Sequence, residues 1–123
     1  MKGQVFSGKG EGASFVNLPW AKRQMEEKLG FTLFPGTLNI KLTREGTRMR
    51  EILKGEGGFA ILPASGHCPA RLFKAKLAGV ECGVVFPQMA SYPVDVVELV
   101  SSVNLREKLC LFDGRQVEVE VIF

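Results

Sequence analysis

The chain is poor in the side chains on which many active sites depend. Its 123 residues include one histidine and three cysteines, and no apolar run reaches the ~18 residues that a membrane span requires. A single imidazole excludes mechanisms that need several of them. The cysteines are odd in number and widely spaced, which favours reduced thiols over a disulfide framework: Cys68, Cys82 and Cys110. His67 and Cys68 have no CxxC or HxxxH partner nearby, so we expect no zinc site.

Charge of one sign is not concentrated anywhere in the chain. There are 16 Lys+Arg against 13 Asp+Glu, a formal net charge of +3, and only a weak basic cluster over residues 43–50. Nucleic-acid-binding proteins usually gather basic residues on one face or arm, so no nucleic-acid partner is expected. Residues 1–5 contain no apolar signal core, which predicts a cytoplasmic protein. The length and the 46% hydrophobic content predict one domain over residues 1–123.

Short apolar runs separated by glycine and proline predict a mainly β fold. The exception is residues 19–30, where Ala21, Met25 and Leu29 form a helical stripe between Pro19 and Gly30. One further helical turn is expected over residues 104–109. Strands are expected at residues 4–6, 37–42, 58–62, 71–77, 80–86, 95–100 and 116–121, with a tight turn at 78–79. Many short strands with one main helix indicate a small β-barrel.

A glycine-rich loop follows the first expected strand. Gly8, Gly10 and Gly12 alternate there with Lys9 and Glu11. Glycines let the backbone come close to a ligand and point successive N–H groups at an anion. The spacing is neither that of a Walker P-loop nor G-x-G-x-x-G leading directly into a helix. From the residues alone, a flexible turn between two elements explains the loop equally well.

Two further places carry polar groups that suit a phosphate-handling site. Thr37 and Asn39 are two residues apart in an expected strand and face the same way, as Mg²⁺ ligands next to a substrate phosphate would. The simpler explanation of this pair is that both residues lie on the solvent-exposed face of a strand. Glu98 interrupts the apolar run 96–100, so it is either turned to solvent or kept for a ligand. Arg106 could hold a phosphate or lie on the surface.

Taken in order, these stretches resemble the CTP-dependent riboflavin kinases known mainly from archaea. The similarity covers nearly the whole chain and is weakest over residues 43–85. It is carried by Ser7 to Gly12 with Phe15 following, by residues 28–31 and 34–39, by Tyr92 and Pro93 with Glu98, and by residues 103–106 and 111–114.

The resemblance implies a six-stranded barrel of the cradle-loop type that transfers the terminal phosphate of CTP to the 5′-hydroxyl of riboflavin, giving FMN and CDP. It implies that Mg²⁺ is bound by Thr37 and Asn39. Glu98 would bind the ribityl chain of the flavin, and it is also the candidate general base. The nucleotide would be held from two sides, by Gly8, Lys9, Gly10, Glu11, Gly12 and Ala13 and by Val103, Asn104, Leu105 and Arg106.

The chain departs from the family pattern just before Tyr92. The pattern has an arginine and a flavin-contacting threonine there, whereas this sequence has Met89 and Ala90. The missing hydroxyl removes one hydrogen bond, about 0.5–1.5 kcal/mol, and the missing arginine removes a charge. Two alternatives therefore stand beside the kinase: a non-catalytic flavin- or nucleotide-binding module of the same fold, and a kinase for another small hydroxylated acceptor.

Overall fold

The computed structural model describes residues 1–8, 15–55, 57–64 and 66–122. The strands are β1 (Lys2–Phe6), β2 (Leu38–Leu42), β3 (Phe59–Ile61), β4 (Ala70–Leu77), β5 (Val80–Pro87), β6 (Val96–Ser101) and β7 (Gln116–Val121). The helices are α2 (Pro19–Leu29), α3 (Arg44–Gly55) and α4 (Leu105–Lys108).

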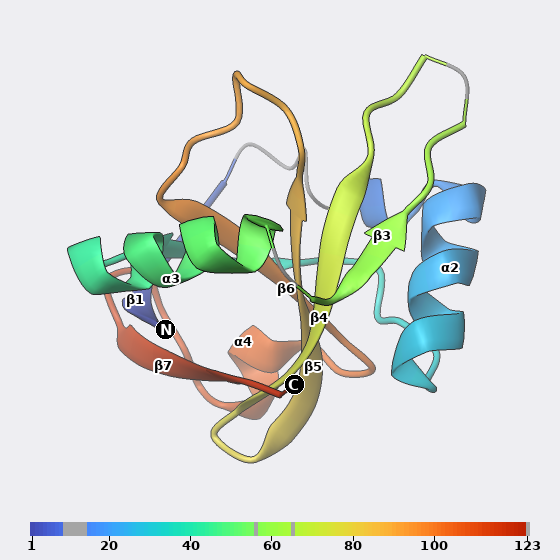
Figure 1. Cartoon of the computed structure of the whole chain (residues 1–123). Helices are drawn as coiled ribbons and strands as arrows, with labels where there is room; N and C mark the ends of the chain where they lie inside the picture. The colour runs from blue at the N-terminus through green and yellow to red at the C-terminus, as the bar shows by residue number, and fades with distance from the viewer. Residues whose placement is uncertain (9–14, 56, 65, 123) are drawn as a thin grey trace.

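The strands form one antiparallel sheet in the order β3-β4-β5-β6-β2-β1-β7, and β4 also pairs with β7. This additional pairing closes six strands into a barrel, while β3 lies outside the ring as an extra edge on β4 (Figure 1). The expected mainly β, six-stranded barrel is therefore confirmed. No helix in the described ranges combines the length and the apolar character needed to span a membrane.

Local sequence signals account for the elements that were expected. α2 begins at Pro19 and ends before Gly30, which adopts the left-handed conformation (φ 83°) and donates its N–H to the Glu26 carbonyl. The hairpin between β4 and β5 turns at Ala78 and Gly79, both with positive φ (48° and 81°), as a two-residue turn requires when its twist matches that of the strands.

The helix α3 was not anticipated, so the structure has two long helices where the sequence indicated one. Its buried residues are Gly46, Arg50 and Leu53, which share one helical face but do not form an apolar stripe. Gly46 is required because a Cβ there would lie 2.8 Å from the Lys2 carbonyl oxygen. Thr43 begins the helix by accepting the Gly46 N–H at 3.1 Å through its hydroxyl oxygen. The two helices lie on different sides of the barrel (Figure 1).

The barrel wall carries a hydrophobic core on each of its faces. The inner core includes Ile40 of β2 together with Val97 and Leu99 of β6. Val85 and Val100 belong instead to a second core, which α2 contributes to from outside the wall. Because strand side chains alternate between faces, this arrangement buries all six residues of β6 and places Glu98 on the outer face.

Candidate functional site

The predicted metal and acceptor residues lie on the outer face of the wall. Asn39 of β2 pairs with Glu98 of β6 on one side and with Phe6 of β1 on the other. Gly8 approaches this row closely, since a Cβ at Gly8 would lie 2.6 Å from the Asn39 amide nitrogen. A glycine at position 8 therefore brings the start of the glycine-rich loop against the predicted metal ligand.

Glu98 is buried, with only 7% of its surface exposed, so it is not turned to solvent. Its Oε1 accepts a hydrogen bond from the Thr37 hydroxyl at 3.2 Å, and its Oε2 accepts one from the Tyr92 hydroxyl at 2.8 Å. Two donors stabilise a buried carboxylate and fix its orientation. In the sequence, Tyr92 was recognisable only as part of a motif, because a contact between residues six apart across a connection leaves no pattern there.

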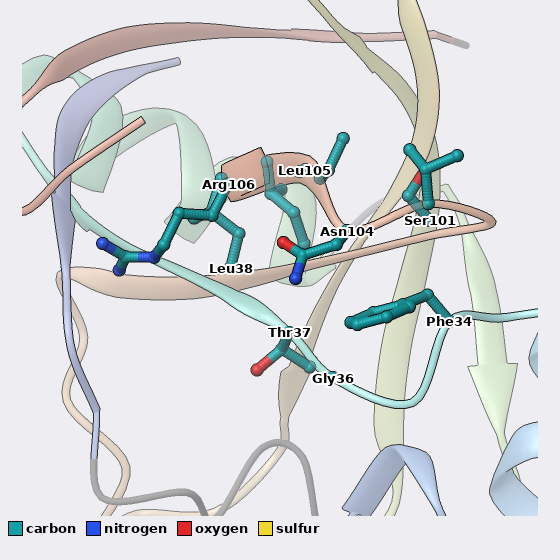
Figure 2. A pocket seen from close by; sticks show the side chains of 10 residues that line it. Phe34, Gly36, Thr37, Leu38, Ser101, Asn104, Leu105 and Arg106 are labelled. Atoms are coloured by element: carbon teal, nitrogen blue, oxygen red, sulfur yellow. The ribbon is translucent and has the colours of Figure 1, made fainter. Parts of the chain in front are cut away.

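A cavity of about 160 Å³ lies beside Thr37 and connects it to the start of α4. Figure 2 shows Asn104 and Arg106 on the α4 side of this space, with Thr37 and Phe34 across from them. Asn104 caps α4 by accepting the Glu107 N–H through its Oδ1 at 3.2 Å, which leaves the amide –NH₂ as a donor. The cavity is lined by Phe34, Gly36, Thr37, Leu38, Leu99, Ser101, Val103, Asn104, Leu105 and Arg106.

The cavity brings together two groups that were predicted separately, the metal ligand Thr37 and the nucleotide-binding residues 103–106. Phe34 and Ser101 were not among the predicted site residues. The Phe34 N–H donates to the Ser101 carbonyl at 2.8 Å, which fixes the aromatic residue at the edge of the cavity. A signal was present in the sequence, because Phe34 directly precedes the Pro-Gly-Thr string.

Most of the glycine-rich loop lies outside the described residues. This applies to the predicted nucleotide-binding residues Lys9, Gly10, Glu11, Gly12 and Ala13. Their role in nucleotide binding stays a prediction, and of the predicted loop residues only Gly8 is described.

A polar latch connects the start of that loop to α4. Asp113, in the turn before β7, accepts hydrogen bonds from the Ser7 hydroxyl at 3.0 Å (Oδ1) and 2.8 Å (Oδ2). Arg106 places its Nη1 3.0 Å from Asp113 Oδ1. The hydrogen bond from Ser7, and then that from Arg106, lowers the pKa of Asp113 below its usual range. The latch therefore joins the two stretches that the resemblance assigns to the nucleotide.

Breaking the latch is expected to weaken nucleotide binding more than it weakens the fold. Asp113→Asn should raise the nucleotide dissociation constant about three- to tenfold, measured by calorimetry, with little change in the urea midpoint because the pair is exposed. Because the pKa of Asp113 is lowered, its ionised form is present above the ordinary carboxyl value of about 3.9 and is lost only below it. Affinity should therefore not vary between about pH 5 and 8 through this group.

Ser7→Ala is the matched variant for the latch. It removes one donor and keeps the Arg106–Asp113 pair, so its effect should be the smaller of the two. An unchanged dissociation constant in both variants would contradict the assignment.

The donor set on the outer face fits a hard divalent cation. Thr37 offers a hydroxyl oxygen, Asn39 an amide oxygen, and Glu98 a carboxylate within hydrogen-bond distance of Thr37. Mg²⁺ commonly takes one or two protein oxygens and completes its shell with water and substrate phosphate.

A closed barrel with a buried carboxylate, a small cavity and several side-chain oxygens on one face is typical of the class of small-ligand-binding β-barrels. A family model named CTP-dep_RFKase, described as domain of unknown function DUF120, matches residues 5–121. The chain therefore belongs to this family, which confirms the resemblance seen in the sequence.

Relatives in several organisms carry the name riboflavin kinase. The chain is 45% identical to one from Pyrobaculum aerophilum, over 98% of this chain and 59% of the relative. It is 42% identical to one from Archaeoglobus fulgidus, over 99% of this chain and 54% of the relative. For Ignicoccus hospitalis the identity is 40%, over 98% of this chain and 70% of the relative. The chain thus spans less than two thirds of the length of the first two relatives.

Proposed function

We propose that the protein is a CTP-dependent riboflavin kinase, which transfers the terminal phosphate of CTP to the 5′-hydroxyl of riboflavin and releases FMN and CDP. The observation that carries this proposal is the buried Glu98, hydrogen-bonded to Thr37 at the edge of the cavity formed by residues 103–106. The relatives' name supports riboflavin as the acceptor, and the family's name supports CTP as the donor. A cytoplasmic location stays a prediction.

The cavity suits one part of a nucleotide and not the whole. Its volume of about 160 Å³ is below the roughly 300–1,000 Å³ of pockets that enclose a small molecule. The Phe34 ring offers a stacking surface, and the Asn104 amide offers donors to the acceptor edge of a base. We assign the base to this cavity and the phosphates to the adjoining Gly8 and the loop that follows it.

The riboflavin-binding half of the proposed site lies beside Tyr92, which does not line the first cavity. A second cavity of about 220 Å³ is lined there by Phe86, Pro87, Met89, Ala90 and Tyr92 with the basic residues Arg50 and Lys54. Ala90 occupies the position where the resemblance implies a contact to flavin. We therefore assign the isoalloxazine ring to this cavity, which directs the ribityl chain toward Glu98.

In the proposed transfer, the 5′-oxygen of riboflavin forms a bond to the terminal phosphorus of CTP as the bond from that phosphorus to the CDP oxygen breaks. Glu98 accepts a hydrogen bond from the 5′-hydroxyl and orients it, and it is the candidate acceptor of the proton. Thr37 and Tyr92 keep the carboxylate in one position, and alignment of this kind accounts for much of phosphoryl-transfer catalysis. Mg²⁺ held by Thr37 and Asn39 would neutralise phosphate charge.

The direct test is an endpoint assay with riboflavin, Mg²⁺ and either CTP or ATP, in which FMN is separated by chromatography. We expect FMN with CTP and little with ATP. Absence of FMN with every nucleotide, from protein whose circular dichroism shows a folded barrel, would contradict the proposal.

The departure at Met89 and Ala90 favours one second candidate, a binding module that retains the pockets without turnover. Riboflavin fluorescence quenching and CTP calorimetry would then show binding while no FMN forms. In that case Ala90→Thr, which restores the hydroxyl of the family pattern, should increase riboflavin affinity. Phosphorylation of a different hydroxylated compound would indicate a kinase for another acceptor instead.

A further inference from the structure

Arg50 is an unusual residue for the interior of a small barrel protein. It lies on α3 and is 4% exposed, and it is one of three buried polar or charged residues in the described ranges, with Glu98 and Ser101. Desolvation lowers the pKa of its guanidinium, and the neighbouring Glu51 carboxylate opposes this effect. A buried cation is unfavourable unless its partners compensate, so the contacts of Arg50 indicate what it does.

These contacts join three elements. The Arg50 Nε donates to the Val96 carbonyl at the start of β6, at 3.0 Å. The guanidinium carbon lies 4.4 Å from the centre of the Phe86 ring on β5 and 5.9 Å from the centre of the Tyr92 ring. Both distances are within the range in which a cation is attracted to an aromatic ring. Arg50 therefore ties α3 to the connection that carries Tyr92.

Tyr92 lies in a connection whose other residues are mostly exposed, and its own side chain packs against the inner core of the barrel. Residues 88–91 and Val94 are exposed, whereas Tyr92 is half-buried. Its N–H donates to the Met89 carbonyl at 3.1 Å, and its hydroxyl donates to Glu98 Oε2 at 2.8 Å. Rotation about the Cα–Cβ bond of Tyr92 would move the hydroxyl away from Glu98, whereas rotation of the ring about its own axis would leave the hydroxyl oxygen in place.

We infer that Arg50 is a positioning residue, which holds the Tyr92 ring so that its hydroxyl meets Glu98 and so that the riboflavin-binding half of the proposed site keeps its shape. Its kinetic consequence rests on the proposed kinase function, whereas its structural consequence does not.

The chain offers a direct readout, because Tyr92 is its only tyrosine. Protein labelled with ¹³Cζ-tyrosine gives one ring resonance, whose shift reports the hydrogen bond of the hydroxyl. Glu98→Gln, which removes the charged acceptor, calibrates the direction of the shift. We expect Arg50→Met to move the resonance in the same direction. Leu53→Ala, at an equally buried position of α3, should leave it in place. An unmoved resonance in folded Arg50→Met would overturn the inference.

The kinetic test separates positioning from general destabilisation. Arg50→Met should raise KM for riboflavin about tenfold while KM for CTP changes less than about twofold. Leu53→Ala should lower the melting temperature without this selectivity. In a Tyr92→Phe background, Arg50→Met should have little additional effect, because the hydroxyl that it positions is already absent. Equal changes in both KM values, or additive effects in the double variant, would overturn the inference.

A variant that keeps the cation covers the case in which Arg50→Met does not fold. Arg50→Lys retains the charge but lacks the planar group that stacks on rings while donating to Val96. We expect a smaller shift of the tyrosine resonance and a smaller rise in riboflavin KM, and unchanged values of both would overturn the inference. If the native protein forms no FMN, the proposed function fails, and the resonance experiment still decides the role of Arg50.

Discussion

Glu98→Gln is expected to reduce FMN formation at least about a hundredfold while the barrel remains folded. The amide keeps the size of the side chain but loses the negative charge and replaces one acceptor oxygen with a donor –NH₂. That nitrogen would face the hydroxyl of either Thr37 or Tyr92, both of which donate to the native carboxylate. A hydroxyl can reverse its role and accept, so the fold tolerates the change, but the acceptor proposed for the riboflavin hydroxyl is lost.

The measurement is steady-state formation of FMN together with the urea midpoint of unfolding. Glu120→Gln is the matched control, because Glu120 is an exposed glutamate on β7. The substitution makes the same chemical change away from the site. Native steady-state constants in Glu98→Gln would assign the carboxylate a structural role only.

The combined change Thr37→Ala and Asn39→Ala is expected to remove Mg²⁺-dependent turnover, by about a thousandfold or more. In the proposed site, the loss of both oxygen ligands would remove the charge neutralisation of the phosphates by Mg²⁺. Metal ions supply several kcal/mol of this kind, and each 1.36 kcal/mol is about tenfold in rate. The barrel should stay folded, because both side chains lie on the outer face and the inner core of the wall is untouched.

Turnover should be followed across a Mg²⁺ titration, with Lys41→Ala as the control on the same strand and face. Lys41 is exposed and two residues beyond Asn39. Thr37→Ser, which keeps the hydroxyl, should retain most of the activity. A double variant with the native rate and the native Mg²⁺ dependence would contradict the metal assignment.

The strands and turns could be predicted because their signals are local. Alternation identified β2 and β7, and the Ala78–Gly79 turn identified the hairpin. α3 left no such signal, since its buried face contains Gly46 and Arg50, whose fit depends on the Lys2 carbonyl and on distant rings. Closure of the barrel could not be predicted from local signals either, because it requires pairing between β4 and β7, which are far apart in the sequence.

The candidate site was predicted as a set of residues and not as a geometry. The sequence indicated that Glu98 was either exposed or kept for a ligand, and the structure shows it buried with two donors. It did not indicate the role of Phe34, of Tyr92 or of Asp113 as a latch. Each of these roles depends on a contact between elements that the chain brings together only when it folds.

The latch has a consequence for how the protein becomes functional during synthesis. Ser7 and Asp113 are separated by 106 positions, and β7 pairs with both β1 and β4. The latch between the two halves of the proposed nucleotide site thus closes only after the turn before β7 has been synthesised, and contacts of such long range slow folding. Because a ligand that binds only the closed barrel stabilises it, CTP should increase the fraction of chains that complete this last step.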